Sequence, residues 1–261
     1  MASASLIRQR VLDTGLATVR SPEVPHLSKI TLLSERDVVR TLRESPKATT
    51  MILDPWYNKG VGGTRSDYAE WLVGLLEIAA RKADHLFLWG FPEIVCKVLD
   101  RLPDGFELNA WLTWYYKNCP SVIKGWRSAQ NACLHIQRKG ARIYPEHFLN
   151  EVQMAKKAEG KLRYMPGPPS VLEAPLAIGF VKRKEQTGHP SQKPVEVIEP
   201  LIRMTTVPGD LVIDPMAGSG TTGVACKLTG RDAILCDIDP NYIDIIERRI
   251  GVKACATLDH A

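Results

Sequence analysis

The sequence predicts an α/β fold in which a mostly parallel sheet is flanked by helices. Apolar runs of strand length alternate with segments of helical periodicity along most of the 261 residues, which is the pattern of parallel strands joined by crossover helices. Two of these runs end in Asp-Pro, and one of the two continues into a glycine-rich turn and a helix. We expect a single domain spanning residues 1–261, because α/β units of this size commonly remain undivided.

The elements of the first half follow from apolar runs and helix caps. The runs predict strands at 29–33, 49–54, 85–90, 107–117 and 131–139, the last two being neighbours. The intervening segments predict helices at 35–44, 66–83 and 92–102. Ser34 with Asp37 indicates the cap of the first helix, and Ser66 the cap of the second.

The pattern weakens in the middle of the chain and then returns. Residues 140–170 have little periodicity and carry a proline cluster, "MPGPPS", so we expect an irregular insertion there. Beyond it, helices are expected at 191–206, 220–230 and 240–250, with strands at 210–215 and 232–239. Gly230 suits the end of the second of these helices and Pro240 the first turn of the third.

Composition excludes several classes of protein. A hydrophobic share of 44% with 24% charged residues is ordinary for a soluble globular chain. No run approaches the roughly 18 apolar residues of a membrane helix, and the start "MASASLIRQR" lacks the core of a secretory signal. The six cysteines are scattered without metal-ligand spacing. We therefore expect a cytoplasmic enzyme with no membrane contact, no metal site and reduced thiols.

Positive charge is concentrated in one segment. Residues 117–184 contain thirteen Lys or Arg against four acids, which gives the segment a charge of +9, whereas the whole chain has +5. Such a surface attracts a polyanion through phosphate contacts and counterion release. The alternative is a solvated basic face that binds no partner.

The glycine-rich turn has the features of a nucleoside site. The strand that ends in Asp214 and Pro215 passes through Gly218 and Gly220 into a helix, so a ligand can approach the backbone and the helix N-terminus closely. The next strand ends in "CDID", and an acid about 20 residues beyond the first glycine is placed to hold ribose hydroxyls. Residues 218–223 also match GxGxxG, so an NAD-binding enzyme is an alternative, as is a tight turn without a ligand.

The other Asp-Pro strand end, "DPWY" at 54–57, suits an exocyclic amino group. Asp54 and the Pro55 carbonyl can accept its two N–H bonds, and Trp56 and Tyr57 offer faces for a flat heterocycle. If both strands lie in one sheet, their tips meet at the same edge. The alternative is an aspartate that caps a turn, with the aromatic rings packed below it.

Taken together, these motifs resemble the S-adenosylmethionine-dependent amino methyltransferases that act on DNA bases, in the motif order called the beta class. "DPWY" resembles the family's Asp-Pro-Pro-Tyr, "HPSQKP" at 189–194 its His-Pro-x-x-Lys-Pro, and "DPMAGSGTT" at 214–222 its cofactor loop. The resemblance covers about residues 29–250. It implies a Rossmann-like methyltransferase fold with a circularly permuted motif order and a small basic target-recognition insertion at 138–184.

The resemblance also implies residue roles. Asp54, Pro55, Trp56 and Tyr57 form the catalytic site, where Trp56 replaces the family's second proline. The residues expected to bind S-adenosylmethionine are Asp54, His189, Lys193, Asp214, Met216, Gly218, Gly220, Thr221 and Asp237. Of these, His189 and Lys193 are expected at the amino acid end of the cofactor, and Met216 replaces a phenylalanine. The residues expected to contact nucleic acid are Asn58, Lys59, Lys124, Arg127, Arg138, Lys139 and Arg142.

The expected function is methylation of adenine N6 in a base flipped out of duplex DNA. Cytosine N4 is less favoured, because family members that act on cytosine usually carry serine in place of Asp54. RNA adenine is a further variant, and an NAD-binding enzyme or a catalytically silent nucleic-acid-binding module are more remote alternatives. A homodimer and a place in a restriction-modification system are implied by the resemblance alone.

Overall fold

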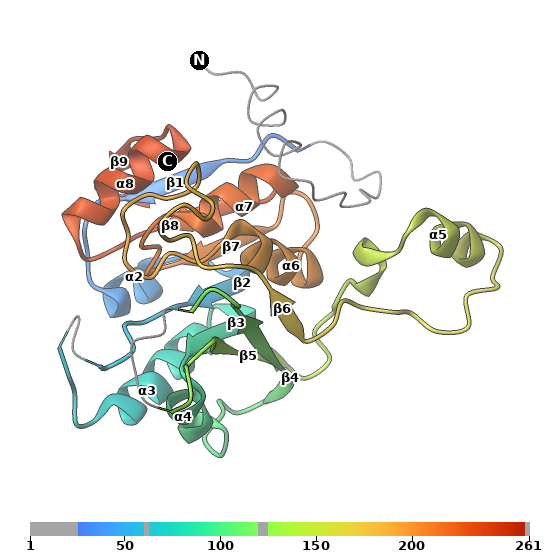
Figure 1. Ribbon diagram of the computed structural model, residues 1–261, viewed down its shortest axis with the longest axis horizontal. Coiled ribbons are helices and arrows are strands. Elements are labelled where there is room, and N and C mark those ends of the chain that lie inside the picture. The colour runs from blue at the N-terminus through green and yellow to red at the C-terminus, as the bar shows by residue number, and fades with distance from the viewer. Residues whose placement is uncertain (1–25, 60–62, 120–124, 259–261) are drawn as a thin grey trace.

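The computed structural model describes residues 26–59, 63–119 and 125–258. In these ranges the chain forms one sheet with the strand order β6-β4-β5-β3-β2-β7-β8-β1-β9 (Figure 1). The strands are β1 (Ile30–Leu33), β2 (Ala48–Leu53), β3 (Ala83–Gly90), β4 (Phe106–Tyr115), β5 (Gln130–Arg138), β6 (Val171–Glu173), β7 (Leu211–Asp214), β8 (Asp232–Leu235) and β9 (Ala254–Cys255). All described pairings are parallel except the two that β5 makes.

Helices cover both faces of the sheet. They are α2 (Val38–Glu44), α3 (Tyr68–Ala80), α4 (Pro92–Val95), α5 (Glu151–Ala158), α6 (Val195–Thr205), α7 (Thr221–Thr229) and α8 (Pro240–Ile250), with 3-10 turns η1 (Cys96–Val98) and η2 (Pro145–Phe148). One buried cluster joins α2, α3 and α4 to one face, and a second joins α6, α7 and α8 to the other. The α/β class and the mostly parallel sheet that the sequence predicted are confirmed.

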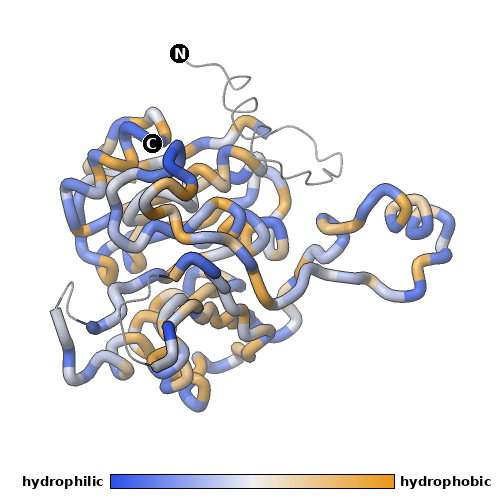
Figure 2. Tube along the Cα trace, in the orientation of Figure 1, coloured by the Kyte–Doolittle hydropathy of each residue, from blue (hydrophilic) through white to orange (hydrophobic). Residues whose placement is uncertain are grey.

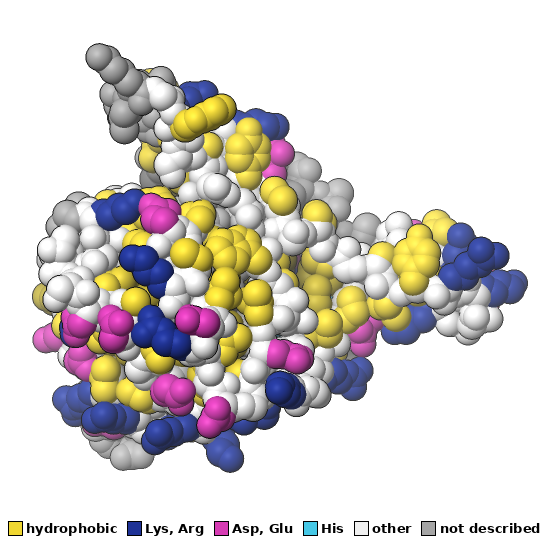
Figure 3. Space-filling model, turned by 90° about the horizontal axis from the view of Figure 1, so that it is seen from below, with side chains coloured by type: hydrophobic (Ala, Val, Ile, Leu, Met, Phe, Trp, Pro, Cys, Tyr) yellow, Lys and Arg dark blue, Asp and Glu magenta, His cyan; other side chains and the backbone are white. Residues whose placement is uncertain are grey.

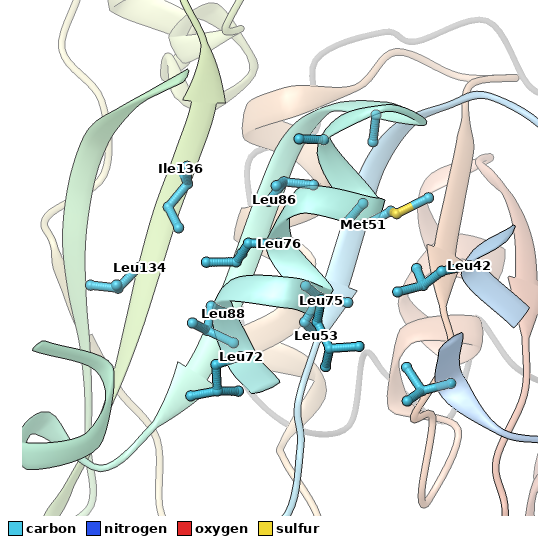
Figure 4. Packing of buried hydrophobic residues seen from close by; sticks show 14 of the residues in the cluster. Leu42, Met51, Leu53, Leu72, Leu75, Leu76, Leu86, Leu88, Leu134 and Ile136 are labelled. Carbon is cyan, nitrogen blue, oxygen red and sulfur yellow. The ribbon is translucent and has the colours of Figure 1, made fainter. Parts of the chain in front are cut away.

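Alternation along the strands builds the two cores. On β3, Leu86 and Leu88 point toward α3, whereas Phe87 and Trp89 belong to the cluster on the α6 side. Figure 4 shows Leu72, Leu75 and Leu76 of α3 packed over Leu53, Leu86 and Leu88. The hydropathy of the chain follows this division, with apolar stretches along the packed elements of the body (Figure 2). Because both faces of the central strands are buried, the sequences of these strands are continuous apolar runs.

Strand order reverses between β2 and β7, and this places the site. From β2 the chain passes through α3 to β3 on one side, and from β7 it passes through α7 to β8 on the other. The two strands are parallel neighbours, with Thr50 opposite Val212 and Met51 opposite Ile213. A crevice at the carboxyl ends of parallel strands, where the order reverses, is the usual ligand site of such a sheet.

Two edges of the sheet must be distinguished. We call the edge that follows Leu53, Gly90 and Asp214 the carboxyl rim, and the opposite edge the amino rim. Because β5 is antiparallel to β3, with Gly90 opposite Ala132 and His85 opposite Gln137, β5 begins at the carboxyl rim and ends at the amino rim. Residues just before β5 and just after it therefore lie at opposite edges.

Two expected helix caps were wrong by a few residues. Helix α2 begins after Asp37 instead of Ser34, because the Asp37 carboxylate accepts the backbone N–H groups of Val39 and Arg40. Helix α3 has Asp67, not Ser66, at its N-cap. The last helix, expected at 240–250, has those bounds in the structure, where the Asp239 side chain caps it.

The middle segment is more ordered than its weak periodicity suggests. Residues 140–170, where an irregular insertion was expected, contain η2 and α5, and β6 follows directly after them. Asn150 and Gln153 form a reciprocal capping box at the start of α5. The helix stands away from the body on an arm, residues 150–166, and buries none of its residues (Figure 1). Without a face against the core it needs no apolar stripe, so its sequence lacks the helical signal.

No helix in the described ranges combines the length and apolar character needed to cross a membrane.

A hydrogen-bond chain centred on two buried histidines links β3, β4 and β5 to the segment between β5 and η2. The His85 Nε2 lies 3.0 Å from the Arg142 carbonyl, which can only accept, so this nitrogen carries the proton. The His85 Nδ1 then accepts from His135 Nε2 at 3.1 Å, and the Asn109 amide donates to His135 Nδ1 at 2.9 Å. Both imidazoles are neutral in this arrangement. Burial, followed by the neighbouring His85, lowers the pKa of His135 to about 3.

We predict that this chain makes the fold sensitive to acid. The unfolded state binds more protons than the folded state below the ordinary histidine pKa of about 6.5, so stability is complete above that pH and is lost as pH falls toward 3. Between pH 6.5 and 5 His135 alone should cost about 2 kcal/mol of unfolding free energy. His135→Gln, which keeps a donor at the same place, should remove this loss in urea denaturation series. Equal losses in both proteins would contradict the prediction.

Candidate active site

The tips of β2 and β7 lie side by side at the carboxyl rim, as the motif analysis required. Asp54 follows β2 and Asp214 ends β7, and these strands are directly paired. Pro55 is buried behind Asp54. Among the described residues, no side chain or backbone group donates a hydrogen bond to the Pro55 carbonyl. The first strand end therefore presents a carboxylate and a carbonyl next to the glycine-rich turn.

Asp54 is bound by a lysine that arrives from the other half of the crevice. The Lys193 ammonium, in a residue only 4% exposed, donates to the Asp54 carboxylate and, at 2.9 Å, to the Tyr57 hydroxyl. The Tyr57 hydroxyl is 3.5 Å from the second Asp54 oxygen. Lys193 was expected to contact the cofactor, and in this structure its ammonium is engaged with Asp54 and Tyr57 of the Asp-Pro-Trp-Tyr motif.

Aromatic rings enclose this cluster. The Lys193 ammonium lies 4.8 Å from the ring centre of Trp89 and 5.5 Å from that of Tyr57. Tyr57 packs against Phe91 with 4.8 Å between ring centres. Burial, followed by the nearby Asp54 charge, raises the pKa of Tyr57 to about 12. The phenol is therefore protonated at neutral pH and can donate a hydrogen bond.

Trp56 faces away from this cluster, toward α3. Its ring packs against Tyr68 and Trp71 with ring centres 5.3 Å and 4.8 Å away. Its indole N–H donates to the Gly63 carbonyl at 3.1 Å. The structure thus gives Trp56 a packing role in holding the loop after the motif, and it leaves Tyr57 as the ring of the tetrapeptide that borders Asp54.

The turn between β7 and α7 is held by acids and by a half-buried arginine. The Gly218 N–H donates to the Asp237 carboxylate at 2.8 Å, and the Asp239 N–H donates to the other Asp237 oxygen at 3.1 Å. Arg249 of α8 donates to the Ser219 carbonyl and the Thr221 hydroxyl, each at 2.9 Å. The turn is therefore fixed to β8 and α8 before any ligand binds.

Asp214 closes the same turn from below. Its carboxylate accepts from the Thr222 hydroxyl and, at 3.1 Å, from the Met216 N–H. Burial raises the pKa of Asp214 to about 7. Met216 packs partly against the core on the α3 side. Asp214 thus shapes the turn through buried hydrogen bonds. The Met216 side chain instead joins the turn to the hydrophobic cluster on the α3 side.

His189 borders the glycine turn from the connection that precedes α6. Its ring lies 4.3 Å from the Tyr242 ring centre, and its Nδ1 accepts from the Ser191 N–H at 3.2 Å. A Cβ atom on Gly218 would lie 2.8 Å from the His189 Nε2, and the φ of Gly218 is +49°. Burial lowers the pKa of His189. Only glycine at 218 leaves room for this ring.

These residues fit a nucleoside ligand. Asp237 is 7% exposed and lies at the end of β8, where carboxylate oxygens suit ribose hydroxyls. Ile238, the next residue, exposes 69% of its surface, which provides an apolar face beside that acid. Gly220 adopts a left-handed conformation and precedes Thr221, the first residue of α7, so backbone N–H groups at the helix start border the crevice. No group suited to a metal ion occurs among the described residues.

The basic residues expected to contact nucleic acid fall in different places. Arg127 precedes β5 at the carboxyl rim and donates to the Cys119 carbonyl at 3.3 Å. Arg138 ends β5 at the amino rim, where it donates to Asp84 and to the Ala80 carbonyl. Lys139 and Arg142 follow it at that rim. The topology therefore separates Arg138, Lys139 and Arg142 from Asp54, because the antiparallel β5 carries them to the far edge.

The remaining candidates lie near the loop after the catalytic motif. Asn58 has a φ of +54° and exchanges two hydrogen bonds with the Arg65 backbone, which closes the loop. Lys59 pairs with Glu93 and lies 4.5 Å from the Phe91 ring centre. Lys124 lies outside the described residues.

Sequence reasoning missed three residues of the site. Trp89 sits under the Lys193 ammonium, Arg249 ties α8 to the glycine turn, and the Thr222 hydroxyl binds Asp214. Trp89 lies inside an ordinary apolar run, and Arg249 lies on the polar side of an amphipathic helix. Neither position carries a local signal. Thr222 belongs to the glycine-loop motif and could have been included.

Comparison with known proteins gives a family match over most of the chain. A family model described as DNA methylase (N6_N4_Mtase) matches residues 48–248. The Type II methyltransferase M.HpaI of Haemophilus parainfluenzae is 28% identical over 218 residues, which cover 77% of this chain and 67% of that protein. The Type II methyltransferase M2.DpnII of Streptococcus pneumoniae is 44% identical over 153 residues. That alignment covers 58% of this chain and 53% of the relative, so the chain spans about half of its length.

Solved structures share the fold. The M1.HpyAVI–SAM complex superposes with a TM-score of 0.65 at 21% identity, covering 85% of this chain and 100% of that one. A structure described as PvuII DNA methyltransferase (cytosine-N4-specific) gives a TM-score of 0.62 at 17% identity, covering 87% of this chain and 89% of that one. At these identities the likeness establishes the Rossmann-like architecture.

We predict that Gly218→Ala displaces the His189 ring. The added Cβ would overlap the imidazole, so the ring should move toward solvent and its pKa should rise toward the ordinary histidine value. Gly105→Ala is the matched control, because Gly105 also has a positive φ, +78°, but has nothing within 4 Å of its Cβ position. Both variants bear a backbone cost of about 1 kcal/mol. Titration of the His189 resonances by NMR distinguishes them, and an unchanged pKa in Gly218→Ala would contradict this account.

Proposed function

Because this chain belongs to the DNA methylase family of amino methyltransferases, we propose that it transfers a methyl group from S-adenosylmethionine to the N6 amino group of adenine in DNA. One observation carries the proposal. The Asp54 carboxylate and the Pro55 carbonyl, to which no group of the described residues donates, stand at the tip of β2, directly beside the glycine turn that follows β7. A base amine and a nucleoside cofactor held at these two tips would meet between them.

The β2 tip suits an amine because it offers two acceptors. An exocyclic amino group has two N–H bonds, and Asp54 and Pro55 can accept one each. Both hydrogen bonds turn the nitrogen lone pair away from conjugation with the ring and fix its direction. The half-buried, protonated Tyr57 and the Phe91 ring beside it offer an aromatic wall for the base.

The β7 side suits the cofactor. Asp237 would hold the ribose hydroxyls and Ile238 would cover one face of the adenine, while Gly218, Gly220 and Thr221 let the ligand approach the backbone. His189 and Asp214 frame that turn without needing direct contact. When bound, S-adenosylmethionine supplies an electrophilic methyl group on a sulfonium. The protein's own task is to bring the amine into line with it.

The choice of base rests on Asp54. An ionised carboxylate is a stronger acceptor than a serine hydroxyl, so it can draw more electron density onto the amine. Adenine N6 is favoured by the resemblance described above, in which members that act on cytosine usually carry serine in place of Asp54. Cytosine N4 is the second candidate, because the PvuII protein, whose structure is described as cytosine-N4-specific, superposes well on this chain. Adenine in RNA remains an alternative substrate, because Asp54 and Pro55 offer the same acceptors to the base whether its sugar is ribose or deoxyribose.

A base in a duplex must leave the stack to reach Asp54. The Asp54 side chain is only 23% exposed at the carboxyl rim, so an amine held in a base pair inside a duplex has little access to it. Unstacking costs a few kcal/mol, which is offset by contacts in the pocket. We therefore propose that the target base is flipped out of the helix.

The DNA should lie along the carboxyl rim. Arg127 lies there, and so do Arg183 and Lys184 in the connection from β6 to Lys193. No carboxylate partner is described for these three cations. Trp126 and Phe180 beside them are 102% and 92% exposed. Cations interleaved with exposed aromatic rings suit phosphates and unstacked bases.

The arm is a weaker candidate for contact with the target. It carries Lys156, Lys157, Lys161 and Arg163, and Figure 3 shows a group of Lys or Arg side chains at the far end of the arm. Its base is attached to the end of α6, where the Tyr144 N–H donates to the Met204 carbonyl. This attachment point lies about 16 Å from Lys193, because the length of helix α6 separates the two. Target recognition within 138–184 is therefore proposed for the part of this segment nearest the carboxyl rim.

Asp54→Asn tests the reaction and its product together. The amide keeps the size of the side chain but replaces one acceptor by a donor, so methyl transfer should fall by at least about 100-fold while cofactor affinity changes little. The measurement is transfer of labelled methyl from S-adenosylmethionine to DNA and to RNA, followed by digestion and identification of the nucleoside. Asp104→Asn, in an exposed turn, is the control.

Each rival predicts a different result in that assay. N6-methyl-2′-deoxyadenosine from DNA supports the proposal. N6-methyladenosine from RNA would replace the assignment to DNA, and N4-methyl-2′-deoxycytidine would replace the base assignment. Affinity for NAD without affinity for S-adenosylmethionine would favour the nucleotide-binding alternative. Nucleic-acid binding with no methyl transfer by the wild-type protein would favour a silent binding module.

The position of the DNA is tested by two matched pairs of substitutions. Arg127→Ala with Lys184→Ala should weaken DNA binding and lower the slope of log Kd against log salt by up to about 2, because two phosphate contacts are lost. Lys139→Ala with Arg142→Ala removes the same charge at the amino rim and should leave the slope unchanged. Fluorescence anisotropy at several salt concentrations provides the measurement. A larger effect of the amino-rim pair would place the DNA on the other edge.

A further inference from the structure

Lys193 spans the crevice between the two halves of the site. Its backbone belongs to the cofactor side, because its carbonyl accepts from the Thr221 hydroxyl at 2.8 Å and Pro194 follows it as the N-cap of α6. Its ammonium belongs to the other side, where it binds Asp54 and Tyr57. A single side chain therefore connects the start of α7 to the tip of β2.

The ammonium is fully engaged where it lies. An ammonium has three N–H donors. The Asp54 carboxylate and the Tyr57 hydroxyl take two, and the third side faces the Trp89 ring, 4.8 Å away. Burial opposes the charge of Lys193, but Asp54 and Tyr57 together outweigh it and raise its pKa above the ordinary value. The cation is thus held in place, since a buried charge without these partners would be costly.

The contact with Lys193 fixes the orientation of the Asp54 carboxylate. Asp54 sits at the end of β2, outside the strand ladder, and its side chain is partly exposed. The bond from Lys193 selects one carboxylate oxygen and leaves the other near the Tyr57 hydroxyl, 3.5 Å away. A carboxylate has about four lone-pair sites. It can therefore accept a further N–H while the lysine keeps it oriented.

We propose that Lys193 is a positioning residue that orients the Asp54 carboxylate and the Tyr57 phenol toward the target amine. This inference rests on the proposed function and adds a residue to its amine-binding side. It differs from the expectation that Lys193 binds the amino acid end of the cofactor. The two roles predict different effects of removing the ammonium.

Lys193→Met removes the charge and keeps most of the apolar stem. If Lys193 positions Asp54, kcat for methyl transfer should fall about 100-fold, as a misplaced acceptor would cause. The KM for DNA and the cofactor Kd, measured by calorimetry on the full-length protein, should each change less than about threefold. Lys82→Met is the matched control, because Lys82 is also partly buried and donates to the Arg43 and Ser45 carbonyls at the amino rim.

The double variant with Asp54→Asn supplies a readout that a general structural defect would not give. If Lys193 acts through Asp54, adding Lys193→Met to Asp54→Asn should lower kcat by less than about threefold further. Independent roles would instead multiply the two losses. Lys193→Gln, which retains a donor without the charge, should give an intermediate kcat and covers the case in which the methionine variant fails to fold.

Three results would overturn the proposal. Multiplied losses in the double variant would show that Lys193 does not act through Asp54. A cofactor Kd raised tenfold or more, with kcat preserved at saturation, would assign Lys193 to the cofactor instead. Full activity of Lys193→Met would remove it from the mechanism. In all three cases the wild-type protein is active, whereas wild-type protein that methylates no nucleic acid would overturn the proposed function itself and this role with it.

Discussion

The pairing of β2 with β7 is the constraint on which the site depends. With Met51 opposite Ile213, the two strands end at one rim, and their crossovers leave in opposite directions. Each tip is then free to carry a different chemical group. In the proposed function, Asp54 and Pro55 would provide acceptors for the amine, whereas the turn that Gly218 and Asp237 shape would hold the nucleoside. Under this proposal the sheet topology, more than any single side chain, would bring a methyl donor and a base within reach of one another.

Burial then determines how charge is used at this rim. Lys193 and Asp54 are drawn together because a buried ammonium needs an acceptor, and the same ion pair ties α6 to β2 across the crevice. Asp214 lies deeper, and burial raises its pKa instead, so it shapes the turn through hydrogen bonds with Thr222 and Met216. Asp54 and Asp214, the acids of two similar Asp-Pro motifs, therefore have different roles, which are set by the partners that each can reach.

Much of this could be predicted from the sequence, and the failures have physical causes. The apolar runs and the Asp-Pro motifs located the sheet and both tips, because a central strand is buried on two faces and its end is not. The place of Arg138 could not be predicted, since the antiparallel direction of β5 is set by pairing with β3 and has no local signal. Helix α5 was missed because it packs on nothing, and the contact of Lys193 with Asp54 joins positions 139 residues apart.

The central claim is that the amine and the methyl donor meet between the tips of β2 and β7. A crystal structure with S-adenosylhomocysteine and a DNA duplex containing one flippable adenine tests it most directly. The account predicts the adenine N6 about 3 Å from both the Asp54 carboxylate and the Pro55 carbonyl, with the cofactor ribose on Asp237. A base bound elsewhere, or a cofactor seated away from the turn after β7, would contradict it.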